Sequence, residues 1–482
     1  MTKVEEIIEL AKRRGFFWQA FSIYGGQSGF LNYAPLGVLL KDNVIGIWKR
    51  NLLRHGAIFL DSPNVTPEEV FKASGHLDRF SDIAARCRKC GNKFKAESLL
   101  KEKGLIPKTS EEARELLMAN RIKCPVCGSV QWDSYDFNVM FKIQTVDGSN
   151  LYLRPETAQG IFTDFKLLLN FNRGKLPMIT AQLGKGFRNE ISPRQGLIRM
   201  REFNMGEVEA FLDSNRVNFP VFPSDNMIRL VPNSSEETDL KLSEAVKNSM
   251  MGHDHAFFMD VAVDVLKDVG LTGSSVRLRQ HRKEELAHYA NDCWDAEADI
   301  DGEWIEVIGI ADRGNYDLTR HQQFSGENLE VTDDGRSFTP SVIEPAFGID
   351  RICFAILVNS YRKRENGYKY LSLHPDIAPY HCVFLPLQNK DGLDALAESI
   401  FSEMKKRDPR VGIDQSGSIG KRYARQDEIG TPFCVTIDYQ SLEDRTVTIR
   451  ERDSTGQKRI RIDDILALTV EEGKNPFSAL YS

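Results

Sequence analysis

Two Cys-x-x-Cys pairs, Cys87/Cys90 and Cys124/Cys127, constrain the fold of this chain more than any other local feature. Each pair turns two thiolates toward one point, and two such turns supply the four ligands of a closed, structural zinc site. Residues 91–123 lie between the pairs, so this stretch must fold back on itself. The spacing predicts a zinc-binding insert, with a redox dithiol or unliganded surface thiols as alternatives.

Composition excludes several classes of protein. The chain has 482 residues, and its 69 Asp and Glu residues against 63 Lys and Arg give a net charge of −6. Any contact with nucleic acid must therefore use a local basic patch. The longest apolar stretch, Ile352–Val358, is far shorter than the roughly 18 residues of a membrane-spanning helix. The N-terminus has no apolar signal core, so we expect a cytoplasmic protein with free thiols.

A second pattern predicts a long β-hairpin formed by residues 179–190 and 199–212. Arg188 and Glu190 share a face of the first strand. Carboxylates beside aromatic rings need a partner, because an unpaired buried charge is unfavourable. Such a face can bind a phosphate, an adenine amino group and an adenine ring, and the alternative is a solvated, salt-bridged hairpin. The strand period of two places six side chains on one face of the second strand: Arg201, Phe203, Met205, Glu207, Glu209 and Phe211.

A third pattern, residues 342–351, predicts a strand that ends at Glu344-Pro345 and a helix with Arg351 in its first turn. A helix N-terminus favours anions, and an arginine adds a planar donor for phosphate or stacking. Taken alone, the pattern is also that of an ordinary helix start. The stretch Gly417–Lys421 is not a phosphate-binding loop, because its glycine spacing is wrong and Arg422 replaces the required Ser or Thr.

In this order, the three patterns resemble the class II aminoacyl-tRNA synthetases, and among them the homodimeric glycyl-tRNA synthetases. The resemblance covers roughly residues 15–470, and the segment 213–256 is more similar to the archaeal and eukaryotic branch. Further stretches that carry the resemblance are Tyr24-Gly-Gly26, Ala73–Phe80, Arg154–Gly160, Ala287–Ala290, Trp304–Arg313, Gly417–Tyr423 and Asp427–Phe433.

The resemblance implies an α+β fold, in which an antiparallel sheet with flanking helices precedes an α/β anticodon-binding domain and carries the zinc-knuckle insert. The expected division is a catalytic core in three parts (1–80, 135–212 and 257–373), a zinc-binding insert (81–134), a second insert (213–256) and the anticodon-binding domain (376–482). From residue 213 to about residue 240 the composition is that of a loop, rich in Pro, Asn and Ser.

The implied activity is that of a glycine–tRNA ligase, which forms glycyl-adenylate from glycine and ATP and transfers glycine to the 3′ end of tRNA(Gly). Arg188 would hold the α-phosphate and Glu190 the adenine amino group, with Phe203 and Arg351 on the two faces of the adenine. Arg188 and Arg351 would be the catalytic residues. The remaining ATP-binding residues would be Asn189, Arg199, Met200, Glu306 and Val307, with Glu306 also a magnesium ligand.

The resemblance also implies a glycine pocket and a tRNA contact. Three carboxylates would surround the glycine ammonium, with Pro345 and Ala346 beside them: Glu156, Glu207 and Glu344. The family usually has Ser at position 346, so a hydroxyl near the substrate is lost here. The tRNA would meet a basic cluster of Lys421, Arg422 and Arg425. The expected partners are glycine, ATP, tRNA(Gly) and a second copy of the chain, with no membrane.

Two other functions are compatible with the same fold. A non-catalytic relative would lose the arginines of the second and third patterns, but Arg188 and Arg351 are both present. A synthetase for another amino acid would not need the stretch Arg154–Gly160 and three pocket glutamates. His76, His281 and His288 are possible ligands or bases, although no His-x-x-x-His pair supports a catalytic metal.

Overall fold

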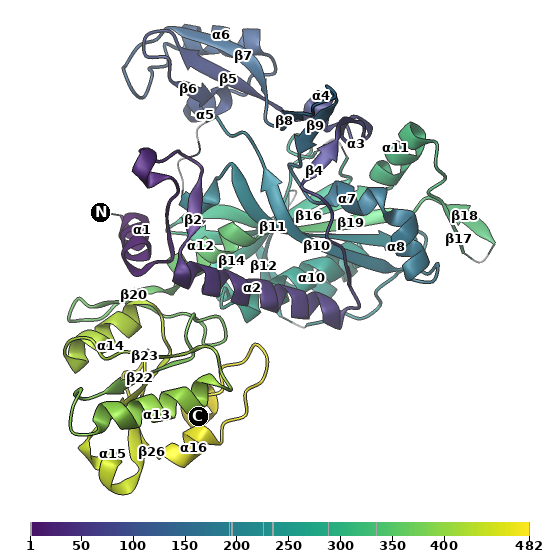
Figure 1. The fold of residues 1–482 in the computed structure, drawn as a ribbon. Coiled ribbons are helices and arrows are strands. Elements are labelled where there is room, and N and C mark those ends of the chain that lie inside the picture. The colour runs from purple at the N-terminus through teal and green to yellow at the C-terminus, as the bar shows by residue number, and fades with distance from the viewer. Residues whose placement is uncertain are drawn as a thin grey trace.

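A computed structural model describes residues 2–191, 193, 196–224, 226–233, 236–287, 289–333 and 335–481. His288, a candidate ligand or base in the sequence, lies outside these residues. Figure 1 shows three parts: a central sheet with its helices, an insert above it, and a C-terminal unit below it. Among the described residues, no helix has both the length and the apolar character needed to cross a bilayer.

The central part is built on a sheet of nine strands, in the order β13-β12-β14-β15-β16-β19-β11-β10-β3. Its pairs are antiparallel except for β10–β3 and β12–β14. The strands in this spatial order are β13 (Thr238–Lys241), β12 (Met227–Val231), β14 (Val276–Gln280), β15 (Asp292–Ile300), β16 (Glu303–Gly314), β19 (Ser341–Gly348), β11 (Glu202–Leu212), β10 (Met178–Phe187) and β3 (Ile58–Phe59).

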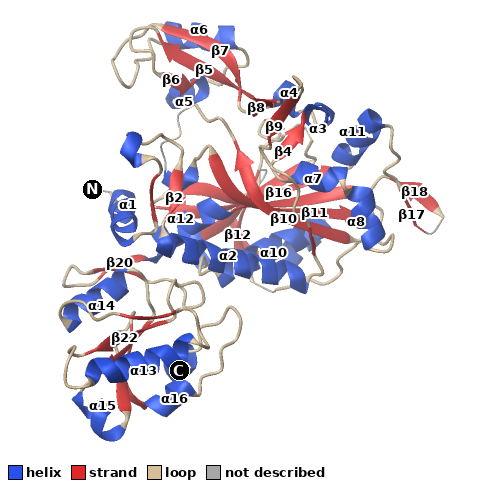
Figure 2. Ribbon diagram, viewed as in Figure 1, coloured by secondary structure: helices blue, strands red, loops and turns tan. Residues whose placement is uncertain are grey.

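Three helices cover one face of this sheet: α2 (Pro35–Arg54), α10 (His253–Asp268) and α12 (Ile349–Ser360). Figure 2 shows α2 and α10 beneath the strands. Trp48 of α2 is fully buried and packs edge-on against Phe347 of β19, with ring centroids 6.1 Å apart. Burial of aromatic rings is a major source of stability in such a core. The opposite face of the sheet is left for the site described below.

The first helix and the strand lengths test the local predictions. In helix α1 (Lys3–Arg14), Thr2 and Glu5 have the sequence spacing of a capping box, and the Thr2 side chain accepts from the Glu5 amide. Strand β10 ends at Phe187, so Arg188 and Glu190 follow the strand instead of sharing a face on it. Strand β19 continues to Gly348, beyond the predicted end, because it pairs with both β11 and β16.

Shorter elements complete the central part. Residues 213 to about 240, whose composition predicts a loop, contain β12 and β13, which form one edge of the sheet, and α9 follows them. The others are β1 (Phe17–Gln19), β2 (Leu31–Tyr33), β4 (Val65–Pro67), α3 (Glu68–Ala73), α4 (His76–Arg79), β8 (Phe141–Gln144), β9 (Asn150–Leu153), α7 (Ala158–Thr163), α8 (Phe165–Phe171), α9 (Leu242–Lys247), α11 (Tyr316–Ser325), β17 (Val331–Asp333), β18 (Arg336–Phe338), β20 (Tyr361–Lys363) and β21 (Lys369–Leu371).

The cysteine-bearing insert is a small unit with its own core. Its sheet has the order β6-β5-β7, and Trp132 packs edge-on against Phe94 inside it. Thr109 has the spacing of an N-cap before α6, and its side chain accepts from the Glu112 amide. The elements are β5 (Ser81–Cys87), β6 (Lys93–Lys95), α5 (Ala96–Leu100), α6 (Ser110–Ala119) and β7 (Trp132–Asn138).

The C-terminal unit has a separate five-stranded sheet of order β23-β22-β24-β25-β26. Strand β22 pairs in parallel with β23 and β24, as expected of alternating strands and helices. The elements are β22 (Cys382–Pro386), α13 (Leu393–Lys405), β23 (Val411–Ile413), α14 (Ile419–Glu428), β24 (Phe433–Ile437), α15 (Tyr439–Asp444), β25 (Thr446–Glu451), β26 (Gln457–Arg461), α16 (Ile462–Leu466) and α17 (Ser478–Tyr481).

Candidate active site

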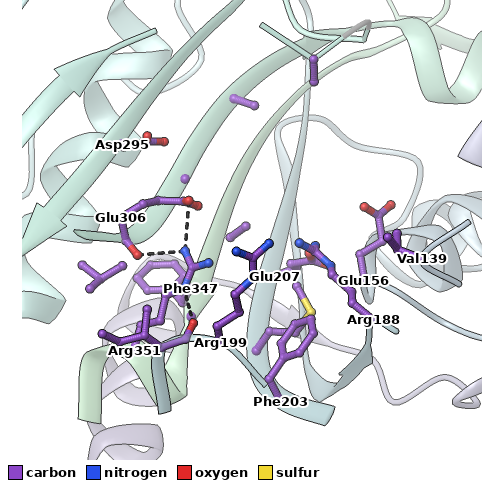
Figure 3. Close-up of a pocket in the computed structure, with 18 of the residues that line it drawn as sticks. Val139, Glu156, Arg188, Arg199, Phe203, Glu207, Asp295, Glu306, Phe347 and Arg351 are labelled. Atoms are coloured by element: carbon purple, nitrogen blue, oxygen red, sulfur yellow. Dashed lines mark hydrogen bonds and ion pairs between the residues drawn. The ribbon is translucent and has the colours of Figure 1, made fainter. Parts of the chain in front are cut away.

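A cavity of about 830 Å³ opens on the face of the central sheet that the three helices leave uncovered. Figure 3 shows side chains from β11, β16, β19 and the start of α12 pointing into it. Asn189 and Pro345 do not line the cavity. The other predicted ATP- and glycine-binding residues all do: Glu156, Arg188, Glu190, Arg199, Met200, Phe203, Glu207, Glu306, Val307, Glu344, Ala346 and Arg351.

One end of the cavity carries arginines and aromatic rings. The Arg188 guanidinium lies 5.3 Å from the ring centroids of both Phe80 and Phe203, and its Nε donates to the Pro155 carbonyl over 3.2 Å. Arg199 Nε donates to Glu190 Oε2 over 2.7 Å. Cations held against ring faces, with a carboxylate beside them, suit a nucleotide that has both a phosphate and an aromatic base.

Arg351 joins the start of α12 to strand β16. Its Nη1 donates to the Glu306 carbonyl oxygen over 2.9 Å and to Glu306 Oε2 over 3.0 Å, as Figure 3 shows, and its Nε donates to the Ile198 carbonyl. Partial burial opposes ionisation of Glu306, but Arg351 brings the pKa of this carboxyl below its ordinary value. Glu306 is therefore ionised near neutral pH and can accept a cation.

Buried carboxylates line the other end. Glu156 Oε2 lies 3.2 Å from His76 Nε2, and Gln159 Nε2 donates to Glu156 Oε1 over 2.9 Å. Burial raises the pKa of Glu156, but His76 and the other partners outweigh burial and hold this pKa below its usual range. A carboxylate that stays ionised while it is 7% exposed is a strong acceptor for an ammonium group.

The pKa values of Glu207 and Glu344 are raised, in contrast to that of Glu156. The amide and hydroxyl of Thr157 donate to Glu207 Oε2 over 2.5 and 2.6 Å, and Arg313 Nη1 donates to Glu344 Oε2 over 2.7 Å. Burial, with Glu156 nearby, raises the pKa of Glu207 to about 7. Burial, opposed by Arg313, raises the pKa of Glu344 to about 8. Both carboxyls can therefore take up or release a proton near neutral pH.

Two buried residues for which the sequence predicted no role lie behind this end and do not line the cavity. Arg313 is 1% exposed, forks onto both oxygens of Asp317 over 2.7 and 2.8 Å, and lies 3.7 Å from the Tyr289 ring centroid. Glu209 is fully buried, and neither carboxylate oxygen has a hydrogen-bond partner. Burial, with Glu344 nearby, raises the pKa of Glu209. Both residues lie in stretches that the sequence singled out, which was the available signal.

A further polar group lies on β14–β15 beside Glu306. His281 Nε2 and Asp295 Oδ2 are 2.8 Å apart, and ligand atoms of His281, Cys293 and Asp295 lie within 4.8 Å of one another. Arg279 Nη2 already donates to Asp295 Oδ2 over 3.2 Å. A second cation would compete with this arginine for the carboxylate.

The predicted basic cluster on α14 is not an exposed patch. Arg422 is 3% exposed and its Nη2 donates to the carbonyls of Gln415 and Gly417 over 2.9 and 2.8 Å. Arg425 is paired with Asp414 through Nε and Nη2 over 3.0 and 2.8 Å. Of the three predicted residues, Lys421 alone is exposed. Arg422 therefore stabilises the loop before α14, because its donors are used by main-chain carbonyls.

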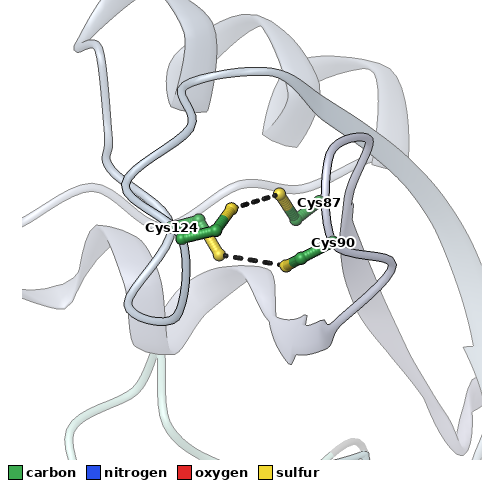
Figure 4. A group of neighbouring side chains, drawn as sticks. Cys87, Cys90 and Cys124 are labelled. Atoms are coloured by element: carbon green, nitrogen blue, oxygen red, sulfur yellow. Dashed lines mark hydrogen bonds between the residues drawn. The ribbon is translucent and has the colours of Figure 1, made fainter.

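The four cysteines of the insert converge as their spacing predicts (Figure 4). Sγ of Cys87 is 3.5 Å from that of Cys127, and Sγ of Cys90 is 3.7 Å from that of Cys124. A tetrahedral zinc with Zn–S bonds of about 2.3 Å requires S–S separations of about 3.8 Å, so the cluster fits this ion. Asn92 Nδ2 donates to Cys90 Sγ over 3.3 Å and is the main cause that lowers the pKa of Cys90 to about 6.

Models of two protein families match the chain. That of the tRNA synthetase class II core domain (G, H, P, S and T) matches residues 141–360, and that of the anticodon binding domain matches residues 381–472. Prolyl-tRNA synthetase from Giardia lamblia in complex with prolyl-adenylate has a similar fold, with a TM-score of 0.64 at 14% identity over 99% of this chain and 78% of that one. The prolyl-tRNA synthetase of Cryptosporidium parvum, complexed with L-proline and AMP, has a TM-score of 0.61 at 13% identity, over 96% of this chain and 73% of that one.

Two archaeal relatives are much more similar in sequence than these two prolyl-tRNA synthetases. A glycine–tRNA ligase of Methanococcus vannielii is 37% identical over 97% of this chain and 99% of its own length. One from Methanocaldococcus jannaschii is 38% identical over 96% of this chain and 97% of its own length. Similarity of this degree along nearly the whole of both chains covers the core, the insert and the C-terminal unit, so this chain belongs to the glycine–tRNA ligase family of class II aminoacyl-tRNA synthetases.

Proposed function

We propose that this chain activates glycine with ATP to form glycyl-adenylate and then transfers glycine to the 3′ end of tRNA(Gly). One observation carries the proposal: a single cavity has arginines and aromatic rings at one end and three buried glutamates at the other. The first end suits the phosphates and adenine of ATP, and the second suits an ammonium group.

In the activation step, the glycine carboxylate attacks the α-phosphorus of ATP in line. The bond from that phosphorus to the oxygen bridging to the β-phosphate breaks, and pyrophosphate leaves with the electron pair. No protein nucleophile takes part, so positioning and charge stabilisation supply the catalysis. Arg188 would stabilise charge on the α-phosphate, and its contacts with the rings of Phe80 and Phe203 support this role. Phe203 and Arg351 would hold the adenine between them.

Glycine would be held by its ammonium group, because it has no side chain to grip. Glu156, Glu207 and Glu344 supply acceptors for the three ammonium protons. In the transfer step, a terminal ribose hydroxyl of the tRNA attacks the carbonyl carbon of the adenylate. The bond from this carbon to the phosphate oxygen breaks, AMP leaves, and the hydroxyl proton is released. Rejection of larger amino acids would be steric.

Two metals are part of the proposal. Glu306 offers the carboxylate oxygen that Mg²⁺ prefers, and bound Mg²⁺ would neutralise charge on the ATP phosphates. The four cysteines would hold one structural Zn²⁺ that stabilises the insert. Lys95 and Asp82 of the insert form a 2.8 Å ion pair and line the cavity, so the insert borders the ATP end.

The remaining partners follow from family membership. We propose that residues 376–482 bind the anticodon region, that the working protein is a cytoplasmic homodimer, and that Lys421 contributes to the tRNA contact. Deletion of residues 376–482 should leave adenylate formation largely intact, weaken tRNA charging and reduce the salt dependence of tRNA binding. Equal charging by the folded truncated protein would disprove this role, and light scattering of the full chain would test the dimer.

ATP–pyrophosphate exchange tests the central reaction. The intact chain should exchange with glycine and much less with alanine or serine. Arg188→Ala should abolish exchange while the free energy of unfolding changes by less than about 1 kcal/mol, as is usual for substitutions outside the core. Exchange with another amino acid in preference to glycine, or normal exchange by Arg188→Ala, would refute the assignment.

A further inference from the structure

A second cavity, of about 300 Å³, adjoins the glycine end of the main one. Its walls come from the loop before β15, the end of β16 and one side of α11. Tyr289 and Ala290 line both cavities, so the two cavities adjoin at these residues. A ligand in the second cavity would therefore lie next to the site where the glycyl group is activated.

The charge of the second cavity is opposite to that of the glycine pocket. No Asp or Glu is among its lining residues in the described part of the chain, whereas two arginines, Arg313 and Arg320, are. Arg313 already binds Asp317 and Glu344. Arg320 donates through Nε to the Ala73 carbonyl over 3.0 Å, and among the described residues no carboxylate lies within ion-pair distance of it. Its two Nη groups can therefore bind a phosphate.

The other lining side chains suit a nucleotide base. The rings of Tyr289 and Tyr316 both face this cavity, with centroids 6.4 Å apart and planes inclined by 42°. Unpaired bases at nucleic-acid ends are bound by stacking on aromatic rings and by hydrogen bonds to their edges. The amides of Asn291 and Gln323 provide donors and acceptors of that kind at the rim.

We propose that this second cavity binds the 3′-terminal nucleotide of the tRNA, with its base against Tyr289 or Tyr316 and a phosphate on Arg320. The inference rests on the proposed transfer reaction, for which a terminal ribose hydroxyl must reach the adenylate carbonyl. A nucleotide held beside Tyr289 and Ala290, where the two cavities adjoin, would direct its ribose toward the glycine end of the main cavity. The glutamates of that end repel phosphate, so the tRNA end needs a separate cationic pocket.

The test separates activation from transfer. Arg320→Gln should keep pyrophosphate exchange with glycine within twofold of the unmodified protein. Transfer of glycine from preformed adenylate to tRNA should slow at least tenfold in a single turnover. Lys166→Gln, at an exposed position of α8 outside both cavities, removes the same charge and should change neither step. Unchanged transfer by Arg320→Gln would overturn the proposal, whereas a lack of exchange by the unmodified chain would refute the proposed function itself.

A truncated tRNA locates the contact. The unmodified protein and Arg320→Gln should bind tRNA that lacks its 3′-terminal nucleotide equally well, but full-length tRNA should bind the variant more weakly. An equal loss with both tRNAs would place the Arg320 contact elsewhere and overturn the proposal. If Arg320→Gln folds poorly because the Ala73 contact is lost, Gln323→Glu serves instead: this exposed rim position would then repel phosphate, and transfer should fall at least fivefold. Unchanged transfer by a folded Gln323→Glu would be equally decisive against the proposal.

Discussion

Nη1 of Arg313 donates to Oε2 of Glu344 over 2.7 Å, while its Nε and Nη2 bind the two carboxylate oxygens of Asp317. All three side chains are nearly or fully buried. One guanidinium therefore orients a carboxylate of the glycine pocket and neutralises part of the negative charge around it. Arg313 lies at the end of β16 and binds α11 through Asp317 and β19 through Glu344, so it holds three elements together beside the substrate pocket.

Arg313→Met should destabilise the protein by about 3–5 kcal/mol, because it leaves two buried carboxylates without their cation. Urea unfolding measures this change. The loss should grow between pH 6 and pH 9, because the pKa of Glu344 is about 8 with Arg313 present and removal of this cation makes ionisation of Glu344 more costly. Arg461→Met removes an exposed partner of Asp463 instead and should change the free energy of unfolding by less than about 1 kcal/mol. If both variants lost the same free energy of unfolding, the buried ion pairs of Arg313 would stabilise the protein no more than an exposed ion pair does.

The raised pKa values of Glu207 and Glu344, about 7 and about 8, predict a pH-dependent stability. An unfolded glutamate titrates near 4.3, so between about pH 4.5 and 8 the folded state binds more protons than the unfolded state. The free energy of unfolding should therefore fall as pH rises through this window. Glu344→Gln, which keeps the shape but not the charge, should flatten the decline in urea unfolding measured from pH 5.5 to 8.5. If the variant's stability declined as steeply as that of the unmodified protein, Glu344 would not be the group that titrates in this range.

The same pKa values affect substrate binding. Ionised carboxylates are needed to accept from the glycine ammonium, so the KM for glycine should fall as pH rises from 6 to 8. The KM for ATP should not follow, because Glu306 at the other end has a lowered pKa and is already ionised. Parallel changes in both KM values would indicate a general conformational effect instead of titration of the pocket.

Local rules predicted the elements whose signals lie within a few residues. The caps formed by Thr2 and Thr109 and the convergence of the four cysteines all depend on short spacings, and the structure has them. The edge strands β12 and β13 were missed, because their pairing partners lie far along the chain. The extension of β19 past Pro345 was missed for the same reason, since pairing on both sides overrides the usual behaviour of proline.

Within the site, residue types were easier to predict than their electrostatic environment. The predicted site residues were those whose side chains suit a nucleotide or an ammonium group, and nearly all of them line the cavity. Arg422 was predicted to contact tRNA, but it is buried and its donors bind carbonyls of the preceding loop, an arrangement that only the tertiary fold produces. Arg313 was unassigned, because Glu344, the pocket carboxylate that it binds, lies on another strand 31 residues along the chain.

Removal of a cysteine ligand tests the zinc proposal. Cys127→Ser should abolish stoichiometric zinc in metal analysis, since it removes one of the four thiolates, and the remaining thiols should react quickly with a disulfide reagent. Cys353→Ser, at a buried cysteine on α12 far from the cluster, should keep the zinc. Because Asp82 and Lys95 line the cavity, we expect adenylate formation to persist with a raised KM for ATP. Absence of zinc from the unmodified protein, with all four thiols freely reactive, would contradict the site.

Ala346 stands where the family resemblance implies a serine, and its neighbours make this difference testable. On β19 it lies opposite Glu207 of β11 and Gly309 of β16, and it lines the cavity. A serine there would add one neutral hydrogen bond near the substrate, worth about 0.5–1.5 kcal/mol. Ala346→Ser should therefore lower the KM for glycine in pyrophosphate exchange by about 2- to 13-fold.

Exclusion of alanine at the same position depends on space and not on charge. Glu156, Glu207 and Glu344 bind the ammonium of either amino acid equally well, so only the extra methyl distinguishes alanine, and one methyl is worth about 1–3 kcal/mol of discrimination. A serine at 346 fills volume that the alanine leaves open, so Ala346→Ser should lower alanine exchange while it improves glycine exchange. Ala346→Gly enlarges the pocket and should do the reverse. If neither substitution changes the ratio of glycine to alanine exchange, residue 346 does not contact the amino acid, and glycine must be placed closer to Glu156 and His76.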